Sequence, residues 1–301
     1  MNVKSPKPAN VLITCVLALL PMLSLADTLE RVRSSNSFTL GYLPNFAPFS
    51  TREGDKASGY AIDLCLKIAE AVKAELGLPG LQVRYQAVKI SDEVSAVSSG
   101  KVDILCTPTP ATLERRKSVS FSVPVYTAGL SAVVRKDAAE ALLNALNGEP
   151  AHTGPVWRAT VNRGLANQTF ATAAGGITEQ WIRDRMRLLG VVATLVTVAD
   201  NDAGIKQVAD GKVDAFFSDR MLLKNHLAKD YPDGMLMVVD RIYDYAPTSM
   251  MVERGDEDLR LLVDITLSDL YRSGEVERAY IQYLGGVSET ARQLFKVYAL
   301  P

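Results

Sequence analysis

Gly100-Lys101-Val102-Asp103 returns as Gly211-Lys212-Val213-Asp214, and an apolar run follows each copy. Each copy closes a helix-like stretch (94–99 and 203–210), so its glycine stands where a left-handed helix end is favoured. The apolar run after each copy predicts a short buried strand. The copies lie 111 residues apart, which is too far for a solenoid repeat and suits two α/β lobes of one domain size each. Two such lobes would enclose a cleft, where small ligands bind.

The first 26 residues predict a signal peptide that is removed on export. Lys4 and Lys7 form a basic start, residues 11–25 are nearly all apolar, and Ser24-Leu25-Ala26 offers a cleavage site of small residues. The apolar stretch is too short and wrongly flanked for a stable membrane span. We therefore expect cleavage after Ala26 and a soluble protein in the periplasm.

The composition of the mature chain excludes some partners. The whole chain carries 33 Lys and Arg against 34 Asp and Glu, and the leader takes away two lysines and no acid, which leaves about −3. This balance gives no electrostatic footprint for nucleic acid or for an anionic membrane surface. Cys65 and Cys106 remain, an even number in an oxidising compartment. Both are expected in one lobe, so they form either a disulfide or two buried reduced thiols.

Alternating strand and helix patterns predict a parallel sheet with helices on its faces. The clearest patterns of the two lobes lie at 38–43, 61–76, 83–88, 160–162, 179–188, 192–198, 221–228 and 236–239. Two further segments of similar length and character are expected to cross between the lobes as a hinge, at 130–135 and 249–252. The expected organisation is a signal peptide, a first part of lobe 1, lobe 2, and a return to lobe 1 with C-terminal helices, at 1–26, 27–132, 133–246 and 247–301.

Candidate ligand-binding residues follow the carboxyl ends of the expected strands, where open parallel sheets bind ligands. Thr109 and Arg115 come after the strand that ends at Cys106. Thr112 is expected to cap a short helix whose first turn contains Arg115. A guanidinium at that place opposes the helix dipole, and a bound anion would offset it. An exposed basic turn, balanced by Glu114, explains the pattern equally well.

Three further candidates lie in other loops. Asp219 follows the second repeated strand, where it either caps the next helix, the commoner role, or receives a ligand ammonium group. Phe46 follows the first strand, where it either flanks an apolar part of the ligand or belongs to the core. Gly164 follows the strand expected at 160–162 and would offer backbone N–H groups to an anion. No metal-ligand spacing, nucleophile–base pair or phosphate-binding glycine loop occurs, so we expect no catalytic residue, metal or cofactor.

In their order along the chain, these motifs resemble the family 3 solute-binding proteins, the periplasmic amino-acid receptors of ABC importers. The segments that carry the resemblance are 40–50, 59–64, both repeated motifs, 112–116 and 119–122. The resemblance covers essentially the whole mature chain and is strongest to the glutamate/aspartate-type branch. It implies an α/β, two-lobed type 2 periplasmic binding protein fold with two hinge crossings and a closing cleft. The implied partners of this monomer are an amino-acid-like ligand and the membrane permease of an ABC importer.

The resemblance also implies roles for individual residues. It assigns the ligand α-carboxylate to Arg115, the α-ammonium group to Asp219 and a stacking contact to Phe46. Thr109 and Gly164 complete the expected set of ligand-binding residues.

Three departures from the family pattern alter this expectation. Pro110 replaces a hydroxyl residue whose backbone N–H also binds carboxylate, and proline removes both donors. Leu165-Ala166 replace two threonines, and Glu93 stands where the acidic-ligand branch has arginine. The last change reverses the charge near the side chain of the ligand, which argues against glutamate.

The leading hypothesis is therefore a periplasmic receptor that captures a small zwitterion and delivers it to an ABC importer. A non-transport accessory or sensor protein on the same fold is the main alternative, because Pro110 and Ala166 lack the usual hydroxyls. A periplasmic enzyme of the dehydratase type is a third hypothesis, and Glu93 is its candidate acid/base residue. The fold alone does not choose among these functions.

Overall fold

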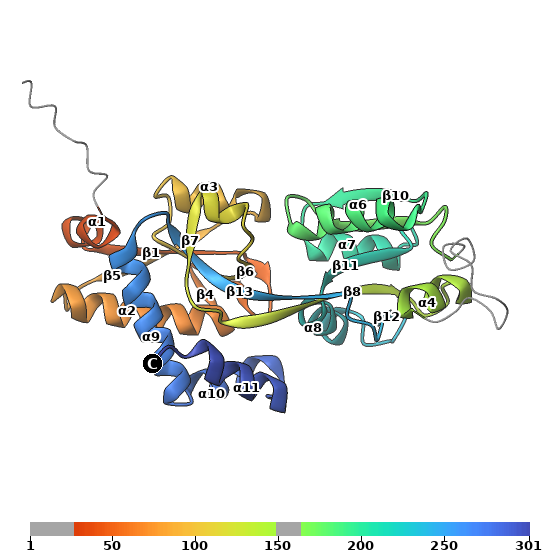
Figure 1. Cartoon of the computed structure of the whole chain (residues 1–301). Coiled ribbons are helices and arrows are strands. Elements are labelled where there is room, and N and C mark those ends of the chain that lie inside the picture. Colours follow the sequence, from red (N-terminus) through yellow and green to blue (C-terminus); the bar gives the residue numbers. More distant parts are fainter. Residues whose placement is uncertain (1–26, 149–163) are drawn as a thin grey trace, which may run out of the picture.

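Two long antiparallel strands, β8 (Tyr126–Arg135) and β13 (Asp244–Glu253), run side by side through the middle of the molecule and join two α/β lobes (Figure 1). The computed structural model describes residues 27–148 and 164–301. The predicted hinge segments, 130–135 and 249–252, lie within these two strands, but the residues that pair between the strands are 126–130 and 244–248. The two-lobed α/β fold with two hinge crossings is therefore confirmed.

One continuous sheet runs through both lobes in the order β10-β9-β11-β8-β13-β6-β1-β5, with β12 added beside β8 and β7 beside β13. Strands pair in parallel inside each lobe, β5 and β6 with β1 in lobe 1 and β10 and β11 with β9 in lobe 2. The strands of lobe 1 are β1 (Ser37–Tyr42), β5 (Gln82–Ala87), β6 (Ile104–Pro110) and β7 (Val119–Phe121). Those of lobe 2 are β9 (Thr169–Ala173), β10 (Thr194–Val198), β11 (Ala215–Asp219) and β12 (Leu236–Val238).

Helices cover both faces of the sheet in each lobe (Figure 1). Lobe 1 contains α1 (Thr28–Ser35), α2 (Tyr60–Leu76), α3 (Glu93–Ser98), α9 (Glu257–Arg272), α10 (Glu275–Leu284) and α11 (Glu289–Tyr298). Lobe 2 contains α4 (Glu140–Asn147), α6 (Ile177–Leu189), α7 (Asn201–Ala209) and α8 (Arg220–Asp230). Short elements complete lobe 1: a small sheet of β2 (Asn45–Phe46), β3 (Ser50–Glu53) and β4 (Lys56–Ser58), and the 3-10 turns η1 (Ile90–Asp92) and η2 (Arg115–Lys117).

The repeated motif builds the same structure twice. Its glycine is left-handed in both copies, with φ of 69° and 68°. In lobe 1 the carboxylate of Asp103 accepts a hydrogen bond of 2.7 Å from the backbone N–H of Thr39 in β1. In lobe 2 the carboxylate of Asp214 accepts one of 2.7 Å from the backbone N–H of Thr169 in β9. Each aspartate thus fixes the strand after the motif against the neighbouring strand, so the sequence repeat marks equivalent places in the two lobes.

Cys65 and Cys106 form a disulfide with an S–S distance of 2.10 Å. Both side chains are fully buried in the core of lobe 1, and the bond ties helix α2 to strand β6. Of the two alternatives that the sequence left open, a disulfide or two reduced thiols, the structure contains the disulfide. It also fastens the strand that leads to the loop containing Arg115.

The first described strand of lobe 2 is β9, which no sequence pattern predicted. The strand expected at 160–162 lies outside the described residues, and so does the predicted signal peptide, 1–26. After that gap β9 is built by Thr169–Ala173, whose small residues give a weak strand signal. The C-terminal segment from 287, whose structure no pattern predicted, forms α11 and packs Phe295 against Tyr271 and Tyr280.

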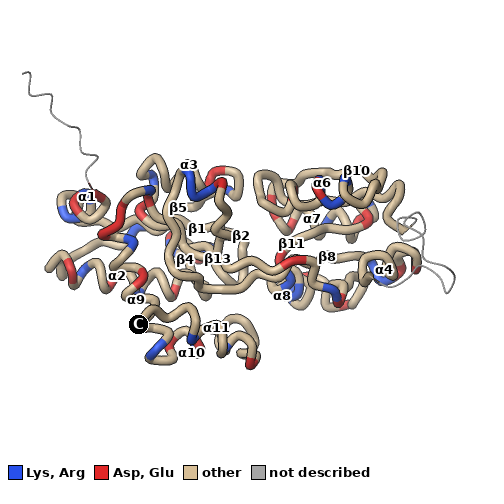
Figure 2. Tube along the Cα trace, in the orientation of Figure 1, with Lys and Arg blue, Asp and Glu red and all other residues tan. Residues whose placement is uncertain are grey.

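Basic and acidic residues are interspersed along both lobes (Figure 2), which fits the small net charge. Within 27–148 and 164–301, no helix has the length and apolar character needed to cross a membrane.

Candidate functional site

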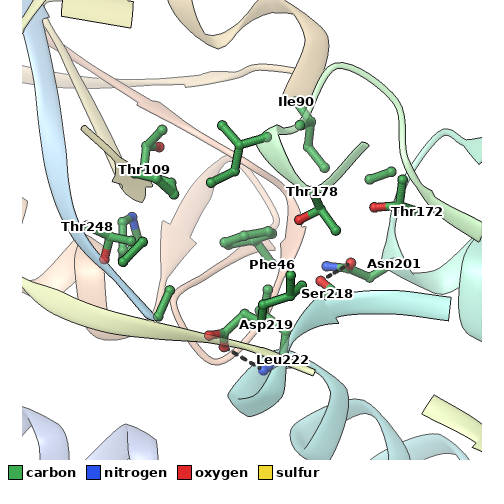
Figure 3. Close-up of a pocket in the computed structure, with 18 of the residues that line it drawn as sticks. Phe46, Ile90, Thr109, Thr172, Thr178, Asn201, Ser218, Asp219, Leu222 and Thr248 are labelled. Atoms are coloured by element: carbon green, nitrogen blue, oxygen red, sulfur yellow. Dashed lines mark hydrogen bonds between the residues drawn. The ribbon is translucent and has the colours of Figure 1, made fainter. Parts of the chain in front are cut away.

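The cleft between the lobes is the candidate site. It encloses about 980 Å³, counting the part that is open to solvent. Residues of both lobes and of the crossing strands line it, and Figure 3 shows lobe 1 residues such as Thr109 opposite lobe 2 residues such as Asn201. The carboxyl ends of β6, β9 and β11 reach the cleft, as expected where strands of a parallel sheet lead into loops.

The two lobes touch at the cleft. Helix α7 of lobe 2 contacts β2 of lobe 1. Gly175, in the loop between β9 and α6, lies so near η1 that a side chain on it would be 3.0 Å from the Cα of Ser91. The structure therefore holds the lobes in a closed arrangement, in which a bound ligand can contact both.

An ion pair occupies the lobe 1 side of the cleft. Arg115 Nη2 lies 3.4 Å from Glu93 Oε2, and the side chains are 12% and 6% exposed. The Thr109 hydroxyl, which has a single proton to donate, lies 3.4 Å from Glu93 Oε1 and 3.2 Å from the carbonyl oxygen of Thr107. The hydroxyl of Thr112 accepts the backbone N–H of Arg115 at 3.2 Å, although the cap residue of the short turn η2 is Glu114 and not Thr112 as predicted.

This ion pair has unused hydrogen-bonding capacity. Arg115 Nη1 is buried and has no hydrogen-bond partner, which is costly unless an acceptor is supplied. Burial raises the pKa of Glu93 to about 7, although Arg115 and the Thr109 hydroxyl act to lower it. A ligand that accepts from Arg115 and donates to Glu93 would satisfy both groups.

Asp219 occupies the lobe 2 side, at the end of β11. Its carboxylate caps α8 by accepting the backbone N–H groups of Met221 at 2.9 Å and Leu222 at 3.3 Å. It also accepts the backbone N–H of Gly129 at 2.9 Å and lies 3.3 Å from the Tyr126 hydroxyl. Burial raises the pKa of Asp219 to about 6 despite these donors. The predicted capping role is present, and the side chain also lines the cleft, where Figure 3 shows it beside Leu222.

Aromatic side chains form much of the remaining wall. Phe46 lies in the cleft with its ring centroid 6.0 Å from that of Phe49. Trp181 of α6 and Phe217 of β11 line the opposite side, and both pack on Tyr243. These rings offer flat apolar surfaces to the part of a ligand that lies between its charged ends.

Pro110 lies in the wall of the cleft at the end of β6. It pairs with Thr248 of β13, and its carbonyl accepts the N–H of Thr112 at 3.0 Å. Because proline has neither a backbone N–H nor a hydroxyl, this position contributes no donor to a ligand. A ligand carboxylate on the lobe 1 side would therefore depend more strongly on Arg115.

The structure places Gly164 away from the cleft. Gly164 is buried against α4, where a side chain would lie 2.0 Å from the carbonyl oxygen of Ala141, and it is not among the residues that line the cleft. Gly164 was expected to offer backbone N–H groups at a helix start on the cleft. The equivalent helix start is that of α6, whose cap Gly176 and first residues Ile177 and Thr178 do line the cleft.

Two polar residues of lobe 2 line the cleft without having been predicted from the sequence. Thr178 and Asn201 line the cleft at the starts of α6 and α7 (Figure 3), and Asn201 accepts the Ser218 hydroxyl at 2.8 Å. The dipeptide Gly175-Gly176 between β9 and α6 was the available signal, because paired glycines often mark a strand-to-helix turn. Among the described residues, no group of three or more His, Cys, Asp or Glu could hold a metal ion.

Comparison with known proteins decides the family. Residues 38–286 match the family described as bacterial extracellular solute-binding proteins, family 3. This chain belongs to that family. An L-glutamate/L-aspartate-binding protein of Pseudomonas aeruginosa is 30% identical over 258 residues, which cover 85% of this chain and 79% of the relative. A glutamate/aspartate import solute-binding protein of Escherichia coli is 23% identical and covers 90% and 86% respectively.

Solved structures show the same fold at low sequence identity. A Streptococcus pneumoniae amino acid ABC transporter substrate-binding protein bound to L-arginine has a TM-score of 0.67, is 22% identical, and covers 90% of this family 3 chain and all of its own. An ancestral amino acid-binding protein, described as a precursor of cyclohexadienyl dehydratase, has a TM-score of 0.69, is 23% identical, and covers 86% and 100%. Arg115, Asp219, Phe46 and Thr109 all line the cleft of the family 3 fold.

Proposed function

We propose that this protein is the periplasmic receptor of an amino-acid ABC importer and that it binds one α-amino acid in its cleft. Family membership and the amino-acid-binding relatives support the receptor class. A leader removed after Ala26, a monomeric state and a permease partner in the membrane complete the proposal.

A single observation carries the ligand assignment: opposite charges lie on opposite lobes of one closed cleft. Arg115 of lobe 1 has a buried donor without a partner, and Asp219 of lobe 2 is a half-buried carboxylate. An α-carboxylate bound by Arg115 forms a charge-assisted hydrogen bond. An α-ammonium group then faces Asp219. A zwitterion that bridges both lobes stabilises the closed arrangement over any open one, because only the closed lobes contact both of its ends.

Calorimetric titration tests this proposal, after a thermal-shift screen with the common L-amino acids has found a ligand. Arg115→Ala is expected to weaken binding by on the order of 2–5 kcal/mol, because it leaves the ligand carboxylate without its buried partner. Asp219→Asn is expected to weaken binding comparably while retaining an oxygen that caps α8.

Arg116→Ala is the matched control, because Arg116 is exposed and lies over the ring of Phe121, outside the cleft. It should bind like the wild type. If Arg115→Ala also binds like the wild type, the assigned site is wrong. If the folded wild type binds none of the amino acids, the accessory-protein hypothesis is favoured over the receptor.

One observation favours a second function. Glu93 is a buried carboxyl with a pKa raised to about 7 in a ligand cleft, and such a group can serve as a general acid or base. A dehydratase would need it to act on a bound substrate. Product analysis by mass spectrometry, after incubation of the protein with the screened ligands, would detect any conversion, and Glu93→Gln would abolish it.

A further inference from the structure

The charges that line the cleft do not balance. Glu93, Asp219 and Asp244 are carboxylates, and Arg115 is the one cation that faces them among the described lining residues. Asp244 is exposed, so solvent screens it. The three inner groups, two carboxylates and one guanidinium, leave an excess of one negative charge.

A neutral zwitterion does not remove this excess. The carboxylate of the ligand binds Arg115, and its ammonium group binds Asp219. Glu93 then shares the single guanidinium of Arg115 with the ligand carboxylate and has no cation of its own. A buried charge without a matched partner is costly. A ligand with one additional positive charge supplies that partner.

We propose that the cleft selects an α-amino acid with a cationic side chain and that Glu93 receives this cation. The inference rests on the proposed function, because it uses Arg115 and Asp219 for the α-carboxylate and α-ammonium groups. It adds the class of ligand and a residue that determines the specificity.

The hydrogen bonds of Glu93 leave room for this role. An ionised carboxylate has about four acceptor sites, and the contacts to Glu93 are a single Arg115 nitrogen at 3.4 Å and the Thr109 hydroxyl at 3.4 Å. Both are long for hydrogen bonds to a charged group, and the arginine contact is not bidentate. Glu93 therefore retains acceptor capacity inside the cleft.

The walls of the cleft suit the same ligand class. Trp181, Phe46 and Phe217 line it with apolar faces, and the methylene stem of a basic side chain packs on such surfaces. A guanidinium or ammonium group is also attracted to the face of an aromatic ring. The apolar wall alone would admit a neutral side chain as well, so the charge of Glu93 makes the distinction.

Paired ligands of equal shape test the proposal by calorimetry at pH 8. L-Arginine and L-citrulline differ in a charged guanidinium against a neutral ureido group, and L-ornithine and L-norleucine differ in a terminal ammonium against a methyl group. In the wild type, the cationic member of at least one pair is expected to bind about 30-fold or more tightly than its neutral partner. In Glu93→Gln this ratio is expected to fall below about 3-fold, with the neutral ligand little changed.

Glu114→Gln is the control, because Glu114 precedes Arg115 in the chain but has an 80% exposed side chain paired with Lys117. It should retain the full preference. Equal affinity of the wild type for charged and neutral partners would overturn the inference and leave the proposed function intact. A preference that survives in Glu93→Gln would remove Glu93 from the role. Absence of binding by any amino acid would overturn both proposals.

Discussion

At the scale of single residues, the charge of Glu93, which is proposed to select the ligand, also lowers the stability of the ligand-free protein. Its pKa rises from 4.5 to about 7 in the folded protein because burial disfavours the charged form. A carboxyl group with a raised folded-state pKa binds its proton more tightly in the folded state than in the unfolded state. The free energy of unfolding that this group contributes therefore falls as pH rises from about 4.5 to about 7.

Glu93→Gln is accordingly expected to stabilise the ligand-free protein at pH 8, by about 2 kcal/mol in the free energy of unfolding, and to change it little at pH 4.5. Urea titrations at the two pH values measure this. Asp219 also has a raised pKa. Its contribution to the free energy of unfolding is the same in the wild type and in Glu93→Gln, so it cancels in the difference between them. The exposed Glu114→Gln variant should show no gain at pH 8. A Glu93→Gln protein that is no more stable than the wild type at pH 8 would contradict the account.

The residues of the site differ in how far the sequence revealed them. Arg115 and Asp219 follow strands marked by the repeated motif, so strand-end reasoning places both at the sheet edge that forms the cleft. Asn201 and Thr178 carry no such marker. Their positions depend on where α7 and α6 begin relative to the sheet, which is a tertiary property. Gly164 was assigned from the strand expected at 160–162, which lies outside the described residues, and the structure places this glycine against α4 and away from the cleft.

At the scale of elements, the disulfide between α2 and β6 closes a loop with a sequence separation of 41 residues. In the chain-entropy account, a bond across such a loop stabilises the folded state by about 4 kcal/mol, because it restricts the unfolded chain. Urea unfolding with and without a reductant should show this difference as a lower midpoint for the reduced protein. The Cys65→Ala/Cys106→Ala variant, which has no bond to reduce, should be insensitive to reductant. Identical midpoints for the wild type in both conditions would contradict the expected stabilisation.

Elements with a clear apolar pattern were predicted well, and β2 to β4 and α11 were not. Helix α2 spans Tyr60–Leu76, against a prediction of 61–76, because a broad apolar stripe and a terminal Gly77 define it. The strands β2 to β4 have two to four residues each, which is too short for a period to be read. Helix α11 is fixed by packing of Phe295 on two tyrosines of other helices, a contact that local sequence does not encode.

At the scale of the whole molecule, the duplication predicted two lobes and a cleft, because equivalent motifs mark equivalent strands in each half. It did not predict how far the cleft closes, since closure depends on contacts between distant segments. The C-terminal helices also contact the hinge: the hydroxyls of Tyr298 in α11 and Thr127 in β8 lie 2.9 Å apart. Tyr280 of α10 packs on Tyr126 of the same strand. Helices α10 and α11 therefore pack against β8, one of the two crossing strands.

The closed arrangement permits a test of lobe motion that requires no ligand. Because a Cβ atom on Gly175 would lie 3.3 Å from the Cβ of Ser91, a Ser91→Cys/Gly175→Cys variant brings two thiols near disulfide distance only when the lobes close. Oxidation to a disulfide should hold the lobes together. The Gly175→Cys substitution itself costs roughly 1–2 kcal/mol of stability, because position 175 has a left-handed backbone conformation. Solution scattering should then give a smaller radius of gyration for the oxidised than for the reduced variant, because reduced, ligand-free lobes can hinge apart at β8 and β13. Ser91→Cys alone should show no such change on oxidation. An equal radius for the oxidised and reduced double variant, with the new bond verified by mass spectrometry, would mean that the lobes stay closed without a ligand, and a hinged receptor would then be the wrong description of this molecule.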